Sequence, residues 1–592
     1  MKKILYTSAA IFMNCFISHA QLIYTPVTNG LNSVTFEGGP GEIEVGDIDN
    51  DGDLDIVSIG DHGSPMINAT ETGIMVWKNN GTGTSWSQTQ QGGFGYGGCA
   101  LGDVNNDGKM DIGYGMHHNY STTDFGNQIM EVALGDGAGN SWTPYDDSLA
   151  TNGEDWGMFC TDFADVNSDG LLDIGANSFG CCAGIHVYQN DGTGHWTQTW
   201  GMLGGNSRHE FMFGDFDNDG NSDLAAASEL GIIWKNNGAG QYSPMLNGFI
   251  PADTAQDYGF VCMAVGDVNN DGAKDVGVID MWSPDVRIFT FNKSLSKWES
   301  ISSGLPTNTT GSLWNIAFAD MDMDGKCDVV LFEKDSIVIY KGDGAGNWTH
   351  AGKINVAEES YPAVTTGDFD HDGYTDIVYL GSPSIGGANY LRVYLHAVSS
   401  PSLAILPNYP QGKECLQAHS VQFVKWTSSV PSGPKATVTI DFSSAGNTGP
   451  WTNVTTGIPN SGVYQWTTPN VSSTNCYLRF TISNGTSTQT VITSSAFGIG
   501  SCATATAMNE STEESSGISI YPNPSPDGMF SVKSSEFNVH SLDVRNILGE
   551  KIVSSIINAK TATLNLSGAD NGIYFVQLSS GGKIYNVKLV KQ

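Results

Sequence analysis

Seven short acidic segments of the sequence carry side chains that could bind a metal ion. The first reads GDIDNDGDLDI (46–56). Counted from its first aspartate, positions 1, 5 and 9 are Asp in every copy, position 3 is Asp or Asn, position 6 is Gly, and position 7 varies freely. Side-chain oxygens at positions 1, 3, 5 and 9, with the backbone carbonyl at position 7, make an all-oxygen set that suits Ca²⁺ better than Mg²⁺.

The pattern predicts up to seven structural Ca²⁺ sites, which we number as copies one to seven. A glycine at position 6 fits a tight turn. The predicted ligands are, copy by copy, Asp47, Asp49, Asp51, Asp53, Asp55; Asp103, Asn105, Asp107, Lys109, Asp111; Asp165, Asn167, Asp169, Leu171, Asp173; Asp215, Asp217, Asp219, Asn221, Asp223; Asp267, Asn269, Asp271, Ala273, Asp275; Asp320, Asp322, Asp324, Lys326, Asp328; and Asp368, Asp370, Asp372, Tyr374, Asp376.

An EF-hand or dockerin loop shares the first six positions but requires an acidic ligand at position 12 and flanking helices. Here position 12 is never acidic, and the flanks alternate as strands do. A solvated acidic turn without metal would leave several carboxylates crowded together, and seven copies argue against it. Position 12 is occupied by Ser58, Tyr114, Ala176, Ala226, Val278, Leu331 and Tyr379.

The segments between the acidic loops repeat as well. Successive copies start between 48 (from 320 to 368) and 62 (from 103 to 165) residues apart, which is typical of a repeat architecture. Each repeat reads as strand A, acidic loop, strand B, strand C, glycine turn and strand D, the four antiparallel strands of a propeller blade. Aromatic residues begin six of the D strands: Trp86, Trp142, Trp196, Tyr242, Trp298 and Trp348.

The seventh D strand is predicted at the other end of the chain. YTPVTNGL (24–31) closely matches YSPMLNGF (242–249), so we expect the N-terminal strand to complete the blade that contains Asp368. Loop, turn and aromatic together resemble the FG-GAP/VCBS repeats of integrin α-chains. That resemblance implies an all-β, seven-bladed propeller over 21–398 with Ca²⁺ in the loops of one face. It also implies that glycan or protein partners bind the opposite face.

The C-terminal third has a different composition. Alternating segments within 420–482 predict an immunoglobulin-like β-sandwich over 399–502, a spacer or accessory binding module in which Cys415, Cys476 and Cys502 leave one disulfide unassigned. A linker (503–516) precedes YPNP (521–524), LG (548–549), GIY (572–574) and a basic end. This tail (517–592) resembles the type IX secretion sorting domain. The resemblance implies recognition by that machinery in a Bacteroidetes-type cell, followed by release or surface attachment.

The N-terminal segment and the net charge of the chain predict where the protein is located. Residues 1–20 have two lysines, a short apolar run and small residues at the end, as a secretory signal peptide does. No later segment is long and apolar enough to span a membrane. The net charge of -36 disfavours nucleic acid as a partner and favours cations. The sequence therefore predicts an extracellular or cell-surface protein.

Two classes of function fit these features. The favoured one is a non-enzymatic adhesion or carbohydrate-binding protein, for which we assign no catalytic residue and no cofactor besides Ca²⁺. The alternative is a secreted polysaccharide-degrading enzyme of the lyase type, although no metalloprotease or nucleophile motif occurs. Residues expected on the ligand face are Trp156, Arg208, His209, Tyr258, Trp282 and Trp314.

Overall fold

The structure is a computed structural model in which every regular element of the described residues is a β-strand. It divides into two units, Met1–Ala503 and Thr504–Gln592, which we treat separately. It describes residues 22–31, 33–34, 43–60, 73–92, 98–116, 129–151, 158–178, 184–203, 207–228, 231–249, 260–280, 285–307, 313–356, 360–382, 389–396, 402–431, 435–500, 518–521, 525, 528–534, 539–546, 551–569, 572–580 and 583–591.

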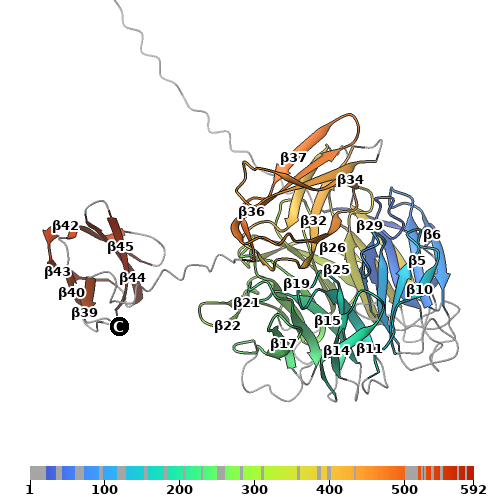
Figure 1. Cartoon of the computed structure of the whole chain (residues 1–592), viewed down its shortest axis with the longest axis horizontal. Coiled ribbons are helices and arrows are strands. Elements are labelled where there is room, and N and C mark those ends of the chain that lie inside the picture. Colours follow the sequence, from blue (N-terminus) through green and yellow to red (C-terminus); the bar gives the residue numbers. More distant parts are fainter. Residues whose placement is uncertain are drawn as a thin grey trace, which may run out of the picture. The chain divides into compact units, whose positions relative to one another are not determined.

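Seven antiparallel sheets make up most of the first unit, as the repeats predict (Figure 1). Blade one contains β3 (Ile43–Gly46), β4 (Asp55–Gly60), β5 (Gly73–Asn79) and β6 (Trp86–Gln91). Blade two contains β7 (Cys99–Gly102), β8 (Asp111–Gly115), β9 (Met130–Gly135) and β10 (Trp142–Pro144). Blade three contains β11 (Met158–Ala164), β12 (Asp173–Ser178), β13 (Ile185–Asn190) and β14 (Trp196–Met202). Blade four contains β15 (Ser207–Gly214), β16 (Asp223–Ser228), β17 (Gly231–Asn236) and β18 (Tyr242–Pro244).

The remaining blades follow the same order. Blade five contains β19 (Phe260–Gly266), β20 (Asp275–Asp280), β21 (Val286–Asn292) and β22 (Lys297–Ser300). Blade six contains β23 (Leu313–Ala319), β24 (Asp328–Glu333), β25 (Ser336–Gly342) and β26 (Trp348–Asn355). Blade seven contains β27 (Ser360–Gly367), β28 (Asp376–Ser382), β29 (Asn389–His396), β1 (Tyr24–Val27) and the short β2 (Ser33–Val34).

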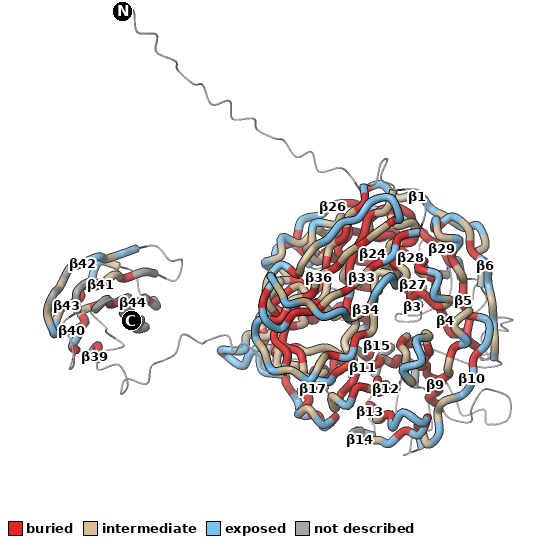
Figure 2. The backbone as a smooth tube through the Cα atoms, turned by 45° about the horizontal axis from the view of Figure 1, so that its top comes forward, coloured by how far each residue is buried: buried red, intermediate tan, exposed pale blue. Residues whose placement is uncertain are grey.

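The seven sheets close into a ring. The first strand of each blade contacts the first strand of the next, and β27 of blade seven contacts β3 of blade one. Apolar side chains of adjacent sheets fill the space between them; Trp77 and Phe369, from blades one and seven, share one cluster. Figure 2 shows buried residues along middle strands such as β4 and β5, and mostly exposed or half-buried residues along the outer strands β6 and β14. The all-β propeller architecture is thereby confirmed.

The two ends of the propeller sequence meet in blade seven. β1 pairs antiparallel with β29, with Tyr24 opposite His396 and Val27 opposite Val393. The turn after β1 then reaches blade one, where the Trp86 amide donates a hydrogen bond to the Asn29 carbonyl over 3.1 Å. The N-terminal strand therefore occupies the D-strand position of the last blade.

A two-sheet β-sandwich follows the propeller in the same unit, around a core that includes Trp426, Trp466 and Phe480. Cys415 is disulfide-bonded, and Cys476 is a free, buried thiol. One sheet contains β30 (Ala404–Tyr409), β32 (Val421–Ser429) and β35 (Val463–Thr467). The other contains β31 (Cys415–Leu416), β33 (Thr437–Ser443), β34 (Thr452–Pro459), β36 (Ser473–Ser483), β37 (Thr488–Ile492) and β38 (Phe497–Ile499).

The second unit is a smaller pair of sheets with its own core, which includes Phe530, Leu542 and Val576. One sheet contains β39 (Ile518–Tyr521), β40 (Met529–Ser534) and β43 (Thr561–Asn565). The other contains β41 (Val539–Asn546), β42 (Lys551–Ala559), β44 (Gly572–Ser580) and β45 (Lys583–Lys591). In the part of the chain that the structure describes, no helix is long and apolar enough to cross a membrane.

The turn after the D strand explains the match between residues 24–31 and 242–249. Gly30 and Gly248 have positive φ angles of 82° and 82°, and both approach the backbone of the next blade. A Cβ atom on Gly30 would lie 1.9 Å from the Trp86 carbonyl oxygen. Only glycine combines this backbone conformation with this close approach.

We predict that Gly30→Ala lowers the free energy of unfolding by about 3 kcal/mol or more, since the methyl group must push two blades apart. Gly457→Ala is the matched control, because Gly457 also has a positive φ of 66° but has no atom near its Cβ position. The control should cost only about 1 kcal/mol of backbone strain. Thermal unfolding of both variants measures the difference, and equal losses would contradict the ring closure described above.

Candidate metal centre

Each acidic loop joins the first and second strands of a blade, and its first aspartate organises the turn. In every copy, one oxygen of this aspartate accepts the position 5 amide at 2.9–3.2 Å, and the other accepts the position 6 amide at 2.7–3.1 Å. The position 5 carboxylate accepts the position 7 amide at 2.8–3.0 Å. These bonds fold the loop around its carboxylates before any ion binds.

The backbone explains the glycine and adds a position that the sequence pattern did not single out. The glycine at position 6 has a φ between 80° and 95° in all copies, which is strained for any other residue. Position 4 is also left-handed, with φ between 55° and 61°. Asn, which tolerates this region better than most residues, occupies it in four copies. The position 4 residues are Asn50, Asn106, Ser168, Asn218, Asn270, Met323 and His371.

The aspartate at position 9 is almost completely buried in every copy and braces the loop. Asp55 accepts the Ile48 amide at 3.1 Å with one oxygen and the Asn79 amide at 2.8 Å with the other. The first bond comes from position 2 of its own loop and the second from strand C. The same pair of bonds recurs in copies two, three, four, six and seven. In copy five the position 2 bond is present, to Asp275.

Position 2 anchors the loop in the core of the blade. Its side chain is apolar and at most 2% exposed in every copy, so the turn cannot slide along the strands. Neither this anchor nor the bracing role of position 9 followed from counting acidic residues. The position 2 residues are Ile48, Val104, Val166, Phe216, Val268, Met321 and Phe369.

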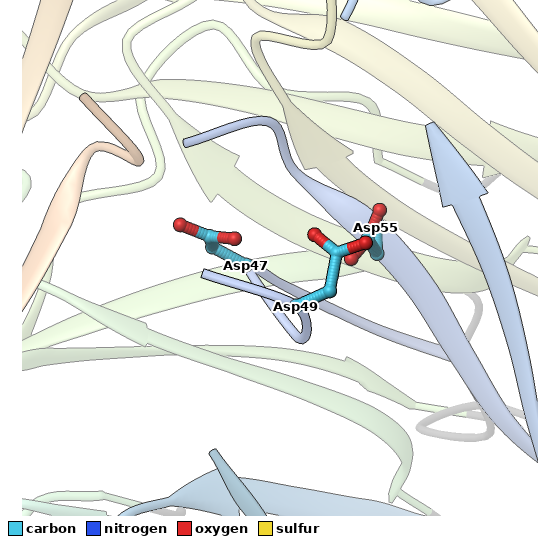
Figure 3. A group of neighbouring side chains, drawn as sticks. All are labelled: Asp47, Asp49 and Asp55. Atoms are coloured by element: carbon cyan, nitrogen blue, oxygen red, sulfur yellow. The ribbon is translucent and has the colours of Figure 1, made fainter. Parts of the chain in front are cut away.

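Four copies bring three carboxylates together. One oxygen from each of positions 1, 3 and 9 lies within 4.8 Å of the others in copies one, four, six and seven. In Figure 3 the carboxylates of Asp49 and Asp55 lie next to each other, and Asp47 reaches the group from the start of the loop. The predicted position 5 ligands are not in these groups of described residues. In copies two, three and five, position 3 is an asparagine, and in copies three and five its side-chain amide donates to the position 5 carboxylate at 2.8 and 3.0 Å.

The donor set fits a hard cation. Carboxylate and amide oxygens are the ligands that Ca²⁺ and Mg²⁺ prefer. Within the described residues, Asp49 Oδ1, Asp217 Oδ1 and Asp322 Oδ1 are buried atoms without a hydrogen-bond partner. All three belong to position 3 of the three-carboxylate groups, where a bound cation would satisfy them. The clusters are therefore able to hold metal ions.

Burial and mutual repulsion act on the ionisation of these groups. Burial raises the pKa of Asp55 to about 8, despite its two amide donors. Burial, together with the Asp219 charge, raises the pKa of Asp215 to about 8. In copy seven, burial raises the pKa of Asp368 to about 8, with the Asp370 charge adding to the rise. Without a cation the folded loops thus favour protonated carboxyl groups.

The β-sandwich covers the face that carries these loops, as Figure 1 shows for β32 and β36 above the propeller. It bonds to the loops of six copies. From donor to acceptor, the contacts are Lys435 to Asp51 (2.8 Å), the Asp103 amide to Gln465 (2.9 Å), the Val421 amide to Asp165 (3.0 Å), the Cys415 amide to Asn218 (2.6 Å), Lys413 to the Asn270 carbonyl, and the Val430 amide to the His371 carbonyl (2.7 Å).

The β-sandwich also forms an ion pair at the junction between blades one and seven. Asp53, at position 7 of copy one, pairs with His371 of copy seven at 3.0 Å and with Lys435 of the sandwich at 2.8 Å. Nearby on the inner strands, burial raises the pKa of Glu44 to about 7, while Lys425 of β32 acts in the opposite direction. The sandwich, which we expected to be a spacer or accessory module, thus forms hydrogen bonds and ion pairs with the acidic loops.

The predicted ligand face is not described. Trp156, Tyr258 and Trp282 lie outside the described residues. Arg208 and His209 fall in β15 and Trp314 falls in β23, but their side chains also lie outside the description. Glu210, the next residue after His209, is buried, and burial raises its pKa well above the ordinary value. Glu210 is therefore not an exposed residue of the predicted ligand face.

Fold and site together define a propeller of acidic-loop blades with a separate C-terminal β-domain. Its repeats match the FG-GAP-like repeat over residues 47–114, 215–278, 267–331 and 320–379. Residues 519–592 match the secretion system C-terminal sorting domain. The chain therefore carries FG-GAP-like repeats and ends in a sorting domain, which confirms both resemblances. The sorting domain indicates type IX secretion to the surface or exterior and an interaction with that secretion machinery.

The solved structures that match the chain have low sequence identity and low TM-scores. A lectin of Agrocybe aegerita described as recognising non-reducing terminal N-acetylglucosamine is 17% identical, with a TM-score of 0.36, over 54% of this chain and 80% of that one. PorZ, a surface component of the type IX secretion system of Porphyromonas gingivalis, is 12% identical, with a TM-score of 0.24, over 95% of this chain and 75% of that one. BBS1N from its complex with ARL6 is 9% identical, with a TM-score of 0.40, over 64% and 99%. Among curated proteins, none matches the chain.

The raised pKa values predict an unusual pH dependence when calcium is chelated. A carboxyl group whose folded pKa exceeds its unfolded value, near 4, binds its proton more tightly in the folded state. Its contribution to stability is full below about pH 4 and is lost as the pH rises towards about 8, the pKa of Asp55, Asp215 and Asp368.

We therefore expect the melting temperature in chelator to fall between about pH 5 and about pH 8. Excess Ca²⁺ should reduce this fall, since the cation pairs with the ionised carboxylates. Thermal scans over this pH range, with and without chelator, provide the measurement. A chelated protein that becomes more stable towards pH 8 would contradict the crowded, buried carboxylates.

Proposed function

We propose that the protein is a calcium-stabilised, secreted or surface-displayed binding module that recognises a glycan or protein ligand. The observation that carries this proposal is the coverage of the metal-loop face by the β-sandwich. Asp103 and Asp165, the position 1 residues of copies two and three, both bond to it. A covered face leaves little access for a partner, so recognition falls to the opposite end of the propeller.

The calcium assignment is part of this proposal. Positions 1, 3 and 9 supply carboxylates to copies one, four, six and seven, and Asn replaces position 3 in the other copies. A divalent ion with many oxygen ligands, Ca²⁺, suits loops that combine these side chains with a backbone carbonyl at position 7. Position 9 is buried in every copy, and the sandwich covers the face that carries these loops, so the proposed ions stabilise the blades rather than take part in recognition.

The ligand would bind loops that join strands B to C and D to the next A. Aromatic residues predicted there, Trp156, Tyr258, Trp282 and Trp314, suit stacking on sugar rings or packing against a protein surface. The domain boundaries predicted from the sequence are part of the same proposal. They are a signal peptide over 1–20, the propeller over 21–398, an immunoglobulin-like sandwich over 399–502, a linker over 503–516 and the sorting domain over 517–592. Release or surface attachment would follow export.

A glycan array tests the proposal with the full mature chain in Ca²⁺ and in chelator. We expect binding in Ca²⁺ that is lost in the double variant Trp282→Ala/Trp314→Ala, because removing two aromatic anchors removes most of the contact surface. The melting temperature of that variant should stay within about 2 °C of the wild type, since surface substitutions change stability little. Asp217→Asn is the converse control, expected to lower the melting temperature without altering the preferred glycan.

An assay for unsaturated products on acidic polysaccharides runs in parallel. Formation of unsaturated products would contradict the binding-module proposal and support the lyase alternative. Failure of the array together with failure of a protein-ligand pull-down from the same environment would contradict recognition at this face.

A further inference from the structure

In copies one, four, five and six, one residue of strand C interacts with position 3 of the loop, and the same register position can be identified in every blade. The register identifies it, because the residue after it pairs with the aromatic that begins strand D, as Asn79 pairs with Trp86 and Asn236 with Tyr242. We call this residue the strand-C neighbour. The seven strand-C neighbours are Lys78, Leu134, Gln189, Lys235, Thr290, Lys341 and Leu395.

The strand-C neighbour varies together with position 3. The three Asn copies have uncharged neighbours, and three of the four Asp copies have a lysine. Ligand positions 1, 3, 5 and 9 carry four negative charges in the Asp copies and three in the Asn copies. One lysine brings −4 to −3, so six of the seven copies have the same charge when only the four ligand positions and the strand-C neighbour are counted; the position 7 side chains, among them Asp53, Lys109 and Lys326, are outside this count. Copy seven differs, because Asp370 is accompanied by Leu395 and its loop stays at −4.

The lysines contact the proposed ligands directly. Lys235 Nζ contacts Asp217 Oδ2 at position 3 and lies 2.6 Å from Asp219 Oδ2 at position 5. Lys341 Nζ makes the corresponding contact with Asp322 Oδ2. These ammonium groups therefore neutralise the extra carboxylate and hold one of its oxygens.

Copies one and five complete the comparison. Lys78 interacts electrostatically with Asp49 but donates its hydrogen bonds to the next blade, to the Ala138 carbonyl and Asn140, both at 2.9 Å. In copy five the neutral pair Asn269 and Thr290 is joined by a 2.9 Å hydrogen bond. Position 3 and its strand-C neighbour thus form a contact pair in charged and in neutral versions.

The other oxygen of the position 3 carboxylate remains for an ion. Asp217 is 9% exposed, and its Oδ1 is buried without a hydrogen-bond partner in the described structure. This carboxylate also belongs to the three-carboxylate group with Asp215 and Asp223. The site of copy four therefore combines a free ligand oxygen with an ammonium group on the neighbouring oxygens.

We propose that the strand-C lysines set the calcium affinity of their loops, so that copies four and six bind Ca²⁺ more weakly than copy seven. An ammonium group a few ångströms from a divalent ion repels it and competes for the same carboxylates. Ligand charge is a known determinant of calcium affinity in oxygen-ligand loops. In copy seven the strand-C neighbour is Leu395, and His371 of the loop pairs with Asp53 of copy one at 3.0 Å. This inference rests on the proposed calcium binding.

Calcium titration of the chelator-stripped full chain by calorimetry tests the proposal. In Lys235→Gln/Lys341→Gln we expect two ions per chain to move from a weaker class to one at least about tenfold tighter, because one opposing charge is removed from each site. The same variant should melt at a lower temperature in chelator, since its carboxylates lose their counter-ion. A lysine with a purely structural role would lower stability without tightening calcium binding.

Two further variants complete the design. Asp217→Asn/Lys235→Gln rebuilds in copy four the Asn167 and Gln189 pair of copy three, and should return that site to about the wild-type affinity. Lys353→Leu removes an equal charge on β26, where Lys353 pairs with Asp335 away from the loops, and should change nothing. Unchanged calcium binding in Lys235→Gln/Lys341→Gln would overturn this proposal. A wild-type chain that binds no calcium would instead refute the proposed function.

Discussion

The structure depends on one interaction, a buried aspartate at the base of each acidic loop that accepts two backbone amides in six of the seven copies. Asp55 and its counterparts join the loop to strand C, so the second and third strands of a blade cannot separate without exposing a carboxylate. The cost is a buried charge near other charges, which the raised pKa of these groups reflects. A bound cation, as we propose, would relieve that cost and would account for the concentration of acidic residues in these loops.

The same loops connect the blades and the sandwich. Strand-C asparagines bond back to the preceding blade; Asn190, for example, donates to the Val104 carbonyl over 2.8 Å. The β-sandwich forms hydrogen bonds with residues at positions 1 and 4 of the loops; for example, the Val421 amide donates a hydrogen bond to the Asp165 carboxylate. Blade packing, domain docking and the proposed metal binding therefore involve one set of backbone segments.

Periodic features of the sequence predicted most of the fold. Spacing, glycine turns and D-strand aromatics indicated seven four-stranded blades, and the match of 24–31 to 242–249 indicated where the N-terminal strand lies. Spacing could not separate the bracing role of Asp223 from a ligand role, since both require a buried aspartate. Nor could it indicate the docking of the sandwich, because contacts such as Lys435 with Asp53 occur once and 382 residues apart. The calcium ligands and the ligand face stay predictions.

The most direct test is the number of calcium ions that one chain retains, measured by elemental analysis after the stripped protein is dialysed against Ca²⁺. The account predicts several ions per chain, up to the seven loops, and fewer in a variant such as Asp368→Asn that alters a four-carboxylate loop. A folded chain that retains no calcium would contradict it, because the buried carboxylates would then be tolerated without a cation.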